Sequence, residues 1–418
     1  MAQQYYFDQR DSFALDKVID LAAQYDIYLK LVVLEKQDYV LNIYETDGSV
    51  SPYLPQNPND LFLGDGRTLT KTRWLQEAWW RYLQARWGYS PHIHSWELLN
   101  EGNPNSTNHY ILADEMGKFF QERFVPNGQT TPNPDTHLVT TSFWNSFPNF
   151  AFWGNNSYPY VDYADVHHYA DESSTGVLDY IYDLSDFDDA ALFSQKLSMY
   201  HGALQPNGPG KPVMRGETGW LFDQTDLFAQ NVSDGLWLHN FIWAGLNPGG
   251  LIESYWVGSP TAAHIYKDGS HDHRPEFKAF ANFVAGIPLN NGRYQDAAAT
   301  SSNNAIRAWG QKDLVAGRAH LWLQNSHHTW RNVADGVSIT AVSGTVTIDG
   351  FQPGAAYLAQ WWDTNQPDPT QQITGTDLLI AQPNGSLVLT VNGLAGDTAV
   401  KISPYADPQF LFLPVITK

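Results

Sequence analysis

Two glutamates stand where a short apolar segment breaks off, and their residue type and setting could do chemistry. The segment SWELLNE at 95–101 ends in Glu101 and is broken by a glycine, and the segment KPVMRGE at 211–217 ends in Glu217. A pair of carboxyl groups can cleave a glycosidic bond, because one protonates the leaving oxygen while the other attacks or stabilises the sugar cation. Their repulsion and their different surroundings keep the two pKa values apart.

Short apolar runs alternate with helical or loop segments over the first 290 residues, which is typical of a parallel sheet with crossover helices. Strands are predicted at 27–34, 94–100, 138–143, 164–169, 212–216 and 251–256, and helices at 11–25, 71–87 and 274–285. In a parallel barrel the carboxyl ends of all strands open on one face. Glu101 and Glu217 should therefore converge, although they lie 116 residues apart.

The composition changes after about residue 290, and short alternating runs separated by Gly, Asn and Pro follow. These runs lie at 319–323, 337–348, 357–362 and 387–391. This pattern predicts an antiparallel β-sandwich. We therefore expect two domains, a catalytic (β/α) barrel at 1–290 and an all-β sandwich at 295–418.

The amino-acid composition excludes several classes of function. The chain has 44 acidic and 24 basic residues, and its formal charge of −20 argues against nucleic acid and anionic membranes as partners. It has no cysteine, which excludes disulfides, thiolate metal sites and a cysteine nucleophile. Its 16 Trp, 22 Tyr and 21 Phe suit either stacking on sugars or an aromatic core.

No cofactor or metal is expected. The triplet at 271–273, His-Asp-His, has no third ligand nearby, so a solvated helix start is favoured over a metal site. No apolar run of membrane-spanning length and no signal peptide are visible. The first residues look like the middle of a domain, so the sequence leaves a secreted and a cytoplasmic location both open.

Taken together and in this order, the motifs resemble a known family. WELLNE at 96–101, HHY at 167–169, RGETG at 215–219 and Trp256 are similar to the signatures of clan A retaining β-glycoside hydrolases, with glycoside hydrolase family 5 and its near relatives closest. The resemblance covers about 1–290 and implies a TIM-type barrel. It places 94–100 on the fourth strand and 212–216 on the seventh.

The resemblance implies a role for each matching residue. Glu101 would be the general acid/base, Glu217 the nucleophile, and Asn100 a hydrogen-bond partner of the sugar 2-hydroxyl. Tyr169 would orient Glu217, His167 would line the pocket, and Trp256 would form the floor of the sugar subsite. Two further tryptophans follow strand ends and could be sugar platforms or rim packing; they are Trp144 and Trp220.

The sequence differs from the family pattern at its N-terminal end. By the same count, 27–34 is the third strand, so the barrel is predicted to be incomplete, with six of eight strands, and to lack the substrate-binding residue of the second. An open barrel leaves a strand edge unpaired, which favours association. We expect a second subunit, in a homo-oligomer, or a rearrangement of the N-terminal residues to cover that edge.

Strand parity yields one structural expectation. Glu97 lies four residues before Glu101, and Arg215 lies two before Glu217, so both should face into the barrel. A buried carboxylate needs a partner, and Arg215 is the candidate partner for Glu97.

The sequence thus predicts a retaining β-glycoside hydrolase. We favour an exo-acting enzyme on small β-glucosides, galactosides or fucosides. An endo-β-glucanase or mannanase of the same clan is the first alternative. The second is a carbohydrate-binding pseudoenzyme, because the second-strand residue is missing. A purely structural protein would predict none of these coincidences at strand ends.

Overall fold

The computed structural model describes residues 7–35, 71–102, 104–105, 107–124, 130–133, 136–143, 148–170, 188–195, 211–220, 234–246, 255–257, 266–268 and 271–405. These form two compact units. The first comprises residues up to 168 together with 211–216, and the second comprises 169–170, 188–195 and the described residues from 217 on. Within these ranges no helix is long and apolar enough to cross a membrane.

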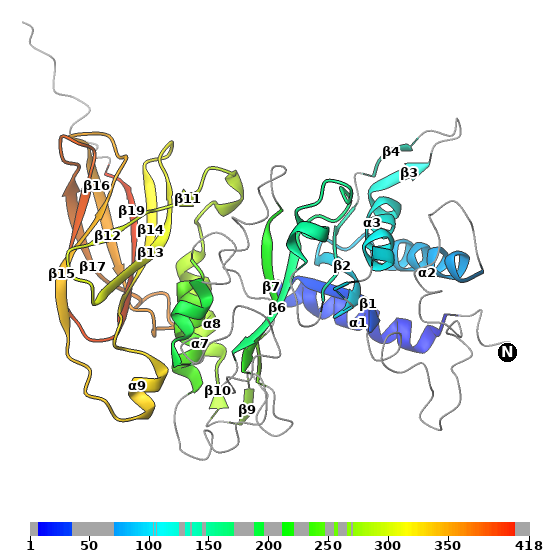
Figure 1. The fold of residues 1–418 in the computed structure, drawn as a ribbon, viewed down its shortest axis with the longest axis horizontal. Coiled ribbons are helices and arrows are strands. Elements are labelled where there is room, and N and C mark those ends of the chain that lie inside the picture. The colour runs from blue at the N-terminus through cyan, green and yellow to red at the C-terminus, as the bar shows by residue number, and fades with distance from the viewer. Residues whose placement is uncertain are drawn as a thin grey trace, which may run out of the picture. The chain divides into compact units, whose positions relative to one another are not determined.

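The first unit is built around a parallel sheet. Strands β1 (Leu29–Glu35), β2 (Ile93–Asn100) and β5 (Leu138–Thr140) pair in that order (Figure 1). In the chain, helix α1 (Gln9–Tyr25) precedes β1, α2 (Lys71–Trp87) lies between β1 and β2, and α3 (Thr107–Gln121) lies between β2 and β5. A short antiparallel pair, β3 (Glu122–Phe124) and β4 (Thr130–Pro132), and a π-helical turn at Asn149–Trp153 complete it. Strand β6 (Ala164–Ala170) begins in this unit.

The two faces of β2 have different environments. The Trp96 ring stacks on Phe120 of α3 with their centroids 5.5 Å apart, so this face is packed against a helix. Glu97 is the next residue and points to the opposite face, as strand parity predicts. Glu97 therefore points away from the face of β2 that packs against α3.

Capping residues define both ends of α1. The Asp8 carboxylate accepts hydrogen bonds from the backbone N–H groups of Arg10 and Asp11, which caps α1. Asp26 ends the helix in the left-handed conformation, with φ of 55°. Such a cap satisfies backbone groups that the helix itself leaves unpaired.

Each of the six predicted strands overlaps a strand of the structure, although residues 251–254 of the last one lie outside the described residues. Three form β1, β2 and β5, and three form a second sheet, β6–β7–β8, with β7 at Val213–Trp220 and β8 at Tyr255–Val257. Strands β7 and β8 pair in parallel. The six strands thus form two three-stranded sheets in a mixed α/β arrangement. The incomplete TIM-type barrel of six strands remains a prediction.

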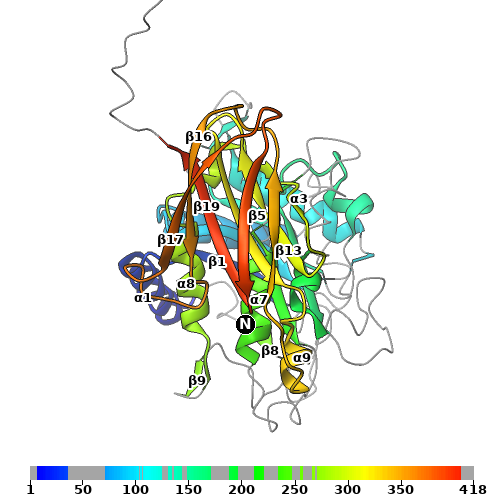
Figure 2. The ribbon, with the colours of Figure 1, turned by 90° about the vertical axis from the view of Figure 1, so that its left-hand side faces the viewer.

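An antiparallel sandwich forms much of the second unit, as predicted (Figure 2). Its strands are β11 (Gln295–Asp296), β12 (Thr300–Ser301), β13 (Ile306–Asp313), β14 (Arg318–Asn325), β15 (Val342–Ile348), β16 (Ala356–Trp362), β17 (Ile373–Ile380), β18 (Leu387–Leu394) and β19 (Asp397–Pro404). One sheet has the order β11-β13-β14-β19-β16-β17 and the other β12-β15-β18. The side chains between them include Leu321, Val346, Leu389 and Val400, all fully buried.

The outer face of the larger sheet is also apolar and buried. Trp322 and Trp362 alternate with inward-facing residues and pack with Trp243 of α7 (Asp234–Ala244) and Phe283 of α8 (Arg274–Val284). The Phe283 and Trp362 rings meet edge to face at 5.5 Å. The segment 290–295, between the predicted domains, connects α8 to β11 inside this unit, so these helices and the sandwich share a core.

A buried imidazole ties the helices to the sheet. His239 of α7 is 2% exposed, with Nδ1 2.7 Å from Glu276 Oε2 of α8 and Nε2 3.0 Å from Asp397 Oδ2 of β19. Burial alone would lower the pKa of His239, but the two carboxylates outweigh it and raise the pKa to about 10. Burial would likewise raise the pKa of Asp397, and the imidazolium outweighs it and lowers that pKa.

Replacing His239 should therefore destabilise the second unit. His239→Leu leaves the buried Asp397 and the half-buried Glu276 without the cation that both contact, and the free energy of unfolding should fall by roughly 3–5 kcal/mol. The stabilisation from a raised histidine pKa is fully present below about pH 6.5 and is lost as the pH rises through about 10. Urea unfolding across this range should show the difference between wild type and variant shrinking. His327→Leu, at an exposed histidine, is the control, and a difference that does not vary with pH would contradict the prediction.

Candidate active site

Glu101 follows directly on β2 and is held in an unusual backbone conformation. Its φ is 55°, in the left-handed region that residues other than glycine rarely adopt. Its backbone N–H donates to Ser142 Oγ at 2.8 Å, and the N–H of Gly102 donates to the Ser142 carbonyl at 2.9 Å. The end of β2 is thus anchored on the segment after β5, and such strain is characteristic of functional positions.

The glycine that breaks the strand is required by a close approach. A Cβ on Gly102 would lie 2.2 Å from His109 Cε1 of α3. His109 is itself fixed, because its Nε2 lies 2.7 Å from the Thr141 hydroxyl, which donates to the Leu99 carbonyl at 3.0 Å. Helix α3, the end of β2 and the segment after β5 therefore meet beside Glu101.

The structure brings His167 to Glu101. His167 lies on β6 and is 7% exposed, and its Nδ1 is 3.3 Å from Glu101 Oε1. Its Nε2 lies 3.5 Å from Asp165 Oδ1. One carboxylate oxygen of Glu101 is thereby oriented by an imidazole.

Beneath Glu101 lies a cluster of buried charges. Glu97 and Asp165 are both enclosed, and the Lys30 ammonium of β1 contacts both, at 3.0 Å from Glu97 Oε2 and 2.7 Å from Asp165 Oδ2. The Ser142 hydroxyl donates to Glu97 Oε1 at 2.5 Å.

The two buried carboxyls differ in their protonation. Burial raises the pKa of Glu97 in spite of Lys30. Burial acts in the same direction on Asp165, but Lys30 and His167 outweigh it and lower the pKa there. Asp165 is therefore the ionised member of the pair at lower pH, and Glu97 is the member that takes up a proton first.

The ammonium that reaches Glu97 is that of Lys30, which sequence reasoning did not single out. Arg215, the predicted partner, is fully buried on β7, and burial lowers its pKa to about 9. The sequence does carry a signal for Lys30, since it is a lysine inside the otherwise apolar strand at 27–34. Ser142 and Asp165 were missed too, because neither belongs to a motif.

The protein itself supplies a cation, the Lys30 ammonium, to the buried carboxylates. Glu97, Asp165 and His167 offer ligand atoms within 4.8 Å of one another, the spacing of a metal site. The Lys30 ammonium, however, contacts both carboxylates and offsets part of their negative charge. At 271–273, Asp272 pairs with Arg274 at the start of α8, with Nε and Oδ1 2.7 Å apart.

The remaining predicted residues are placed as follows. Asn100 is the last residue of β2, half-buried and in register with Glu35. Glu217 lies within β7, half-buried, in the second unit, so its convergence with Glu101 remains a prediction. For three residues the structure describes only the strand: Tyr169 on β6, Trp220 on β7 and Trp256 on β8. Trp144 lies outside the described residues.

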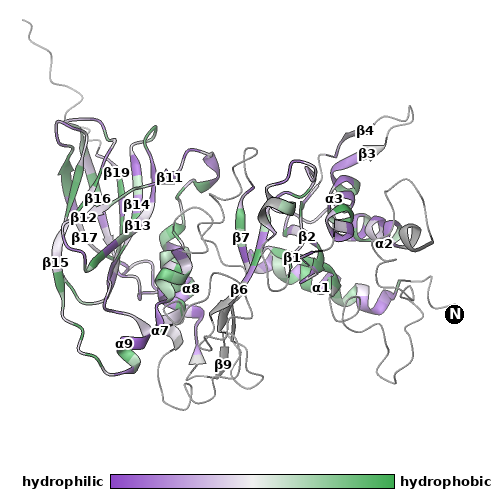
Figure 3. Cartoon of the chain, in the orientation of Figure 1, coloured by the Kyte–Doolittle hydropathy of each residue, from purple (hydrophilic) through white to green (hydrophobic). Residues whose placement is uncertain are grey.

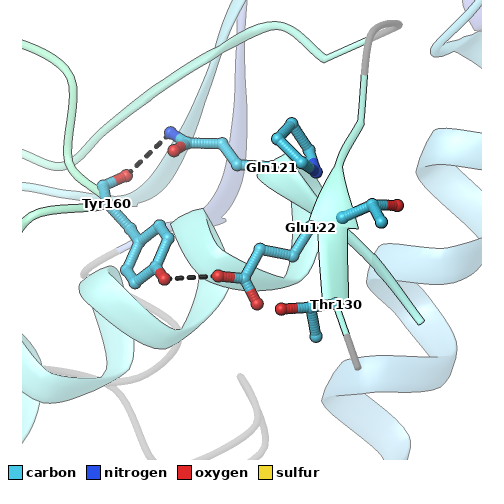
Figure 4. A pocket seen from close by; sticks show the side chains of 6 residues that line it. Gln121, Glu122, Thr130 and Tyr160 are labelled. Atoms are coloured by element: carbon cyan, nitrogen blue, oxygen red, sulfur yellow. Dashed lines mark hydrogen bonds between the residues drawn. The ribbon is translucent and has the colours of Figure 1, made fainter. Parts of the chain in front are cut away.

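A separate pocket lies where α3 meets β3 and β4 (Figure 4). Its volume is about 260 Å³ and its lining includes Gln121, Glu122, Thr130 and Tyr160. The Tyr160 hydroxyl donates to Glu122, and Gln121 Nε2 donates to the Tyr160 carbonyl at 3.0 Å. These polar groups satisfy one another, and the pocket contains none of the predicted site residues.

Comparison with known proteins finds glycoside hydrolases. No family model and no curated protein matches the chain. Among solved structures, it is similar to a glucosidase from Croceicoccus marinus (11% identity, 81% of this chain and 75% of that chain, TM-score 0.42). It is similar to a family 39 glycoside hydrolase from Bacteroides cellulosilyticus WH2 (12%, 96% and 72%, 0.43) and to the GH39 enzyme from Xanthomonas axonopodis pv. citri (13%, 79% and 72%, 0.34).

Two of these three structures are named as family 39 enzymes, and the predicted closeness to family 5 stays a prediction. All three TM-scores lie below 0.5. The case for a glycosidase therefore rests on the motifs and on the geometry around Glu101.

Filling the space at Gly102 should disturb this geometry. Gly102→Ala places a methyl group against the His109 ring, and overpacking of this kind costs about 1–3 kcal/mol. Denaturant unfolding measures the loss. Gly375→Ala on β17 is the matched control, because nothing lies within 4 Å of an added Cβ there, and it should change stability by about 0.5 kcal/mol or less. Equal stability of the two variants would refute the tight approach.

Proposed function

We propose that this chain is a retaining β-glycoside hydrolase. Its catalytic residues would be Glu217 as the nucleophile and Glu101 as the general acid/base. The observation that carries the proposal is the setting of Glu101, which ends a buried strand in a strained conformation with its carboxylate against His167 and its N–H on Ser142. A carboxylate on a solvated loop would need none of these contacts.

The reaction would proceed in two displacements. In the first, a Glu217 oxygen bonds to the anomeric carbon as the glycosidic C–O bond breaks, and Glu101 gives its proton to the leaving oxygen. In the second, Glu101 takes a proton from water, the water oxygen bonds to the anomeric carbon, and the ester to Glu217 breaks. The sugar is released with its configuration retained.

His167 and Asn100 would support these steps. His167 contacts Oε1 of Glu101 and can leave Oε2 to face the leaving oxygen. Asn100 stands next to Glu101 at the end of β2, where its amide could bond the sugar 2-hydroxyl. Tyr169, Trp256, Trp144 and Trp220 remain proposed substrate-binding residues on the strength of their sequence positions alone.

The proposed substrates are small β-glucosides, galactosides or fucosides, cleaved from the chain end. An endo-acting β-glucanase or mannanase is the alternative within the same chemistry. A pseudoenzyme that only binds carbohydrate is the alternative outside it. The analysis of products from an oligosaccharide distinguishes release of single sugars from internal cleavage.

Activity on aryl β-glycosides tests the proposal. Glu217→Gln should reduce kcat at least about a thousandfold. Glu101→Ala should slow substrates with poor leaving groups most, and added azide should restore turnover as a β-glycosyl azide. Proton NMR of the first product should show retention. No turnover on the aryl glycosides, β-glucan or mannan, together with measurable sugar binding, would establish the pseudoenzyme instead.

We also propose that a second copy of the chain covers the open edge of the first unit. Strand β1 is at the edge of its described sheet and Val32 on it is 46% exposed. Nearby on α1, Leu21 is 51% and Tyr25 65% exposed, and Figure 3 colours much of this helix as hydrophobic. Two β1 edges paired about a two-fold axis would satisfy the same backbone groups in both copies. The alternative cover, residues 1–6, lies outside the described residues.

Light scattering coupled to size exclusion tests this assembly. The wild type should elute with twice the mass of one chain. Val32→Lys puts a charge on the edge of β1 and should yield monomers. Val315→Lys, at a 79% exposed valine in the second unit, should leave the mass unchanged. A wild type that is monomeric at all concentrations would rule the assembly out.

A further inference from the structure

We propose that Lys30 is a positioning residue for the acid/base. From β1, it holds Glu101 in its working conformation and protonation state through two arms of buried side chains. The inference rests on the proposed function of Glu101. Lys30 would contact neither substrate nor reacting atoms.

The first arm fixes the backbone of Glu101. Lys30 Nζ lies 3.0 Å from Glu97 Oε2, and the other oxygen of Glu97 accepts from the Ser142 hydroxyl at 2.5 Å. Ser142 Oγ in turn accepts the N–H of Glu101 at 2.8 Å. Because Glu101 is in the left-handed region, its conformation persists only while its surroundings enforce it. This arm supplies that constraint.

The second arm reaches the carboxylate. Lys30 Nζ lies 2.7 Å from Asp165 Oδ2, and Asp165 Oδ1 lies 3.5 Å from His167 Nε2. The other ring nitrogen of His167 lies 3.3 Å from Glu101 Oε1. A change of charge at Asp165 is therefore transmitted to Glu101 through a single imidazole.

The charge balance explains why one ammonium matters. Lys30 neutralises much of the charge of Glu97 and Asp165. Without it, the two carboxylates would draw a proton onto His167. An imidazolium beside Glu101 favours the ionised carboxylate and lowers its pKa. The acid/base would then be unprotonated when it should donate to the leaving oxygen.

The charged groups around the cluster come from three further strands. Glu97 and His94 lie on β2, Asp165 and His167 on β6, and the fully buried Arg215 on β7. Burial is the largest cause that lowers the pKa of His94, and it remains when Lys30 is replaced.

A close contact between Asp165 and Gly216 offers a second way to disturb the arm that runs through Asp165 and His167. A Cβ on Gly216 of β7 would lie 1.9 Å from Asp165 Oδ1. Only glycine leaves room for the carboxylate in this position. Gly216→Ala would therefore displace Asp165 and leave Lys30 intact.

Kinetics of Lys30→Met and Lys30→Arg test the inference. In Lys30→Met, kcat/KM should fall at least about tenfold more for an aryl glycoside with a poor leaving group than for a dinitrophenyl glycoside, since only the former needs the acid. The alkaline limb of the pH profile should move down by about one pH unit. Lys30→Arg, which keeps the charge, should largely restore both. Equal losses for the two substrates with an unmoved limb would show a merely structural lysine.

Two further measurements keep the test decisive. If Lys30→Met does not fold, Gly216→Ala should show the same leaving-group dependence, and its absence there would overturn the inference. If the wild type turns over no glycoside, the proposed function has failed, and NMR titration of His167, assigned with His167→Gln, then examines Lys30 alone. Lys30→Met should raise the pH at which His167 titrates, and an unmoved titration would refute the role.

Discussion

The first unit depends on the burial of two carboxylates that share one ammonium. Glu97 and Asp165 come from different strands, and neither could be enclosed as an anion without a compensating charge. Lys30 supplies it from a third strand, so β1, β2 and β6 are joined by electrostatics as well as by packing. Such a trio contributes little net stability compared with apolar side chains, but it specifies how the strands must align.

That alignment reaches the carboxyl end of β2, where the chain changes direction at Glu101. The hydrogen bonds of Ser142 serve the buried Glu97 on one side and the strained backbone on the other. A single hydroxyl thus couples the charge cluster to the position of Glu101. The network therefore runs from the end of β2 into the sheet, and Glu101 is its member at the strand end.

Many elements of this fold could be predicted from local sequence, because apolar runs and helical spacing are local signals, but helices α3 and α7 were not predicted. Differences arise where tertiary bonds intervene. The run at 138–143 was predicted as one strand, whereas β5 ends at Thr140. The residues after it still bond to the end of β2, through Ser142 and an isolated bridge between Gly102 and Phe143, but not as a regular strand. Strand β7 extends beyond the predicted 216 to Trp220, because its last residues pair with β8.

The glycine break beside Glu101 was visible in the sequence, and the His109 ring that demands it was not. The sequence predicted that Glu97 is buried, but not that Lys30 and Asp165 join it, since these two residues are 135 positions apart and no motif relates them. Strand parity predicts Arg215 as a partner of Glu97, and that pairing stays a prediction. The contact of Glu97 with Lys30 depends on which strands lie side by side. Pairing between distant residues is a property of topology, which single-residue patterns do not encode.

The tryptophan-bearing outer face of the larger sandwich sheet limits how this protein could be rearranged by gene recombination. A β domain that is appended as an exchangeable module needs a polar exterior of its own, and this one shares Trp322 and Trp362 with α7 and α8. A recombination breakpoint between α8 and β11 would expose an aromatic surface on both products. The smallest segment that could be transferred intact includes these helices, so the sandwich is inherited together with α7 and α8.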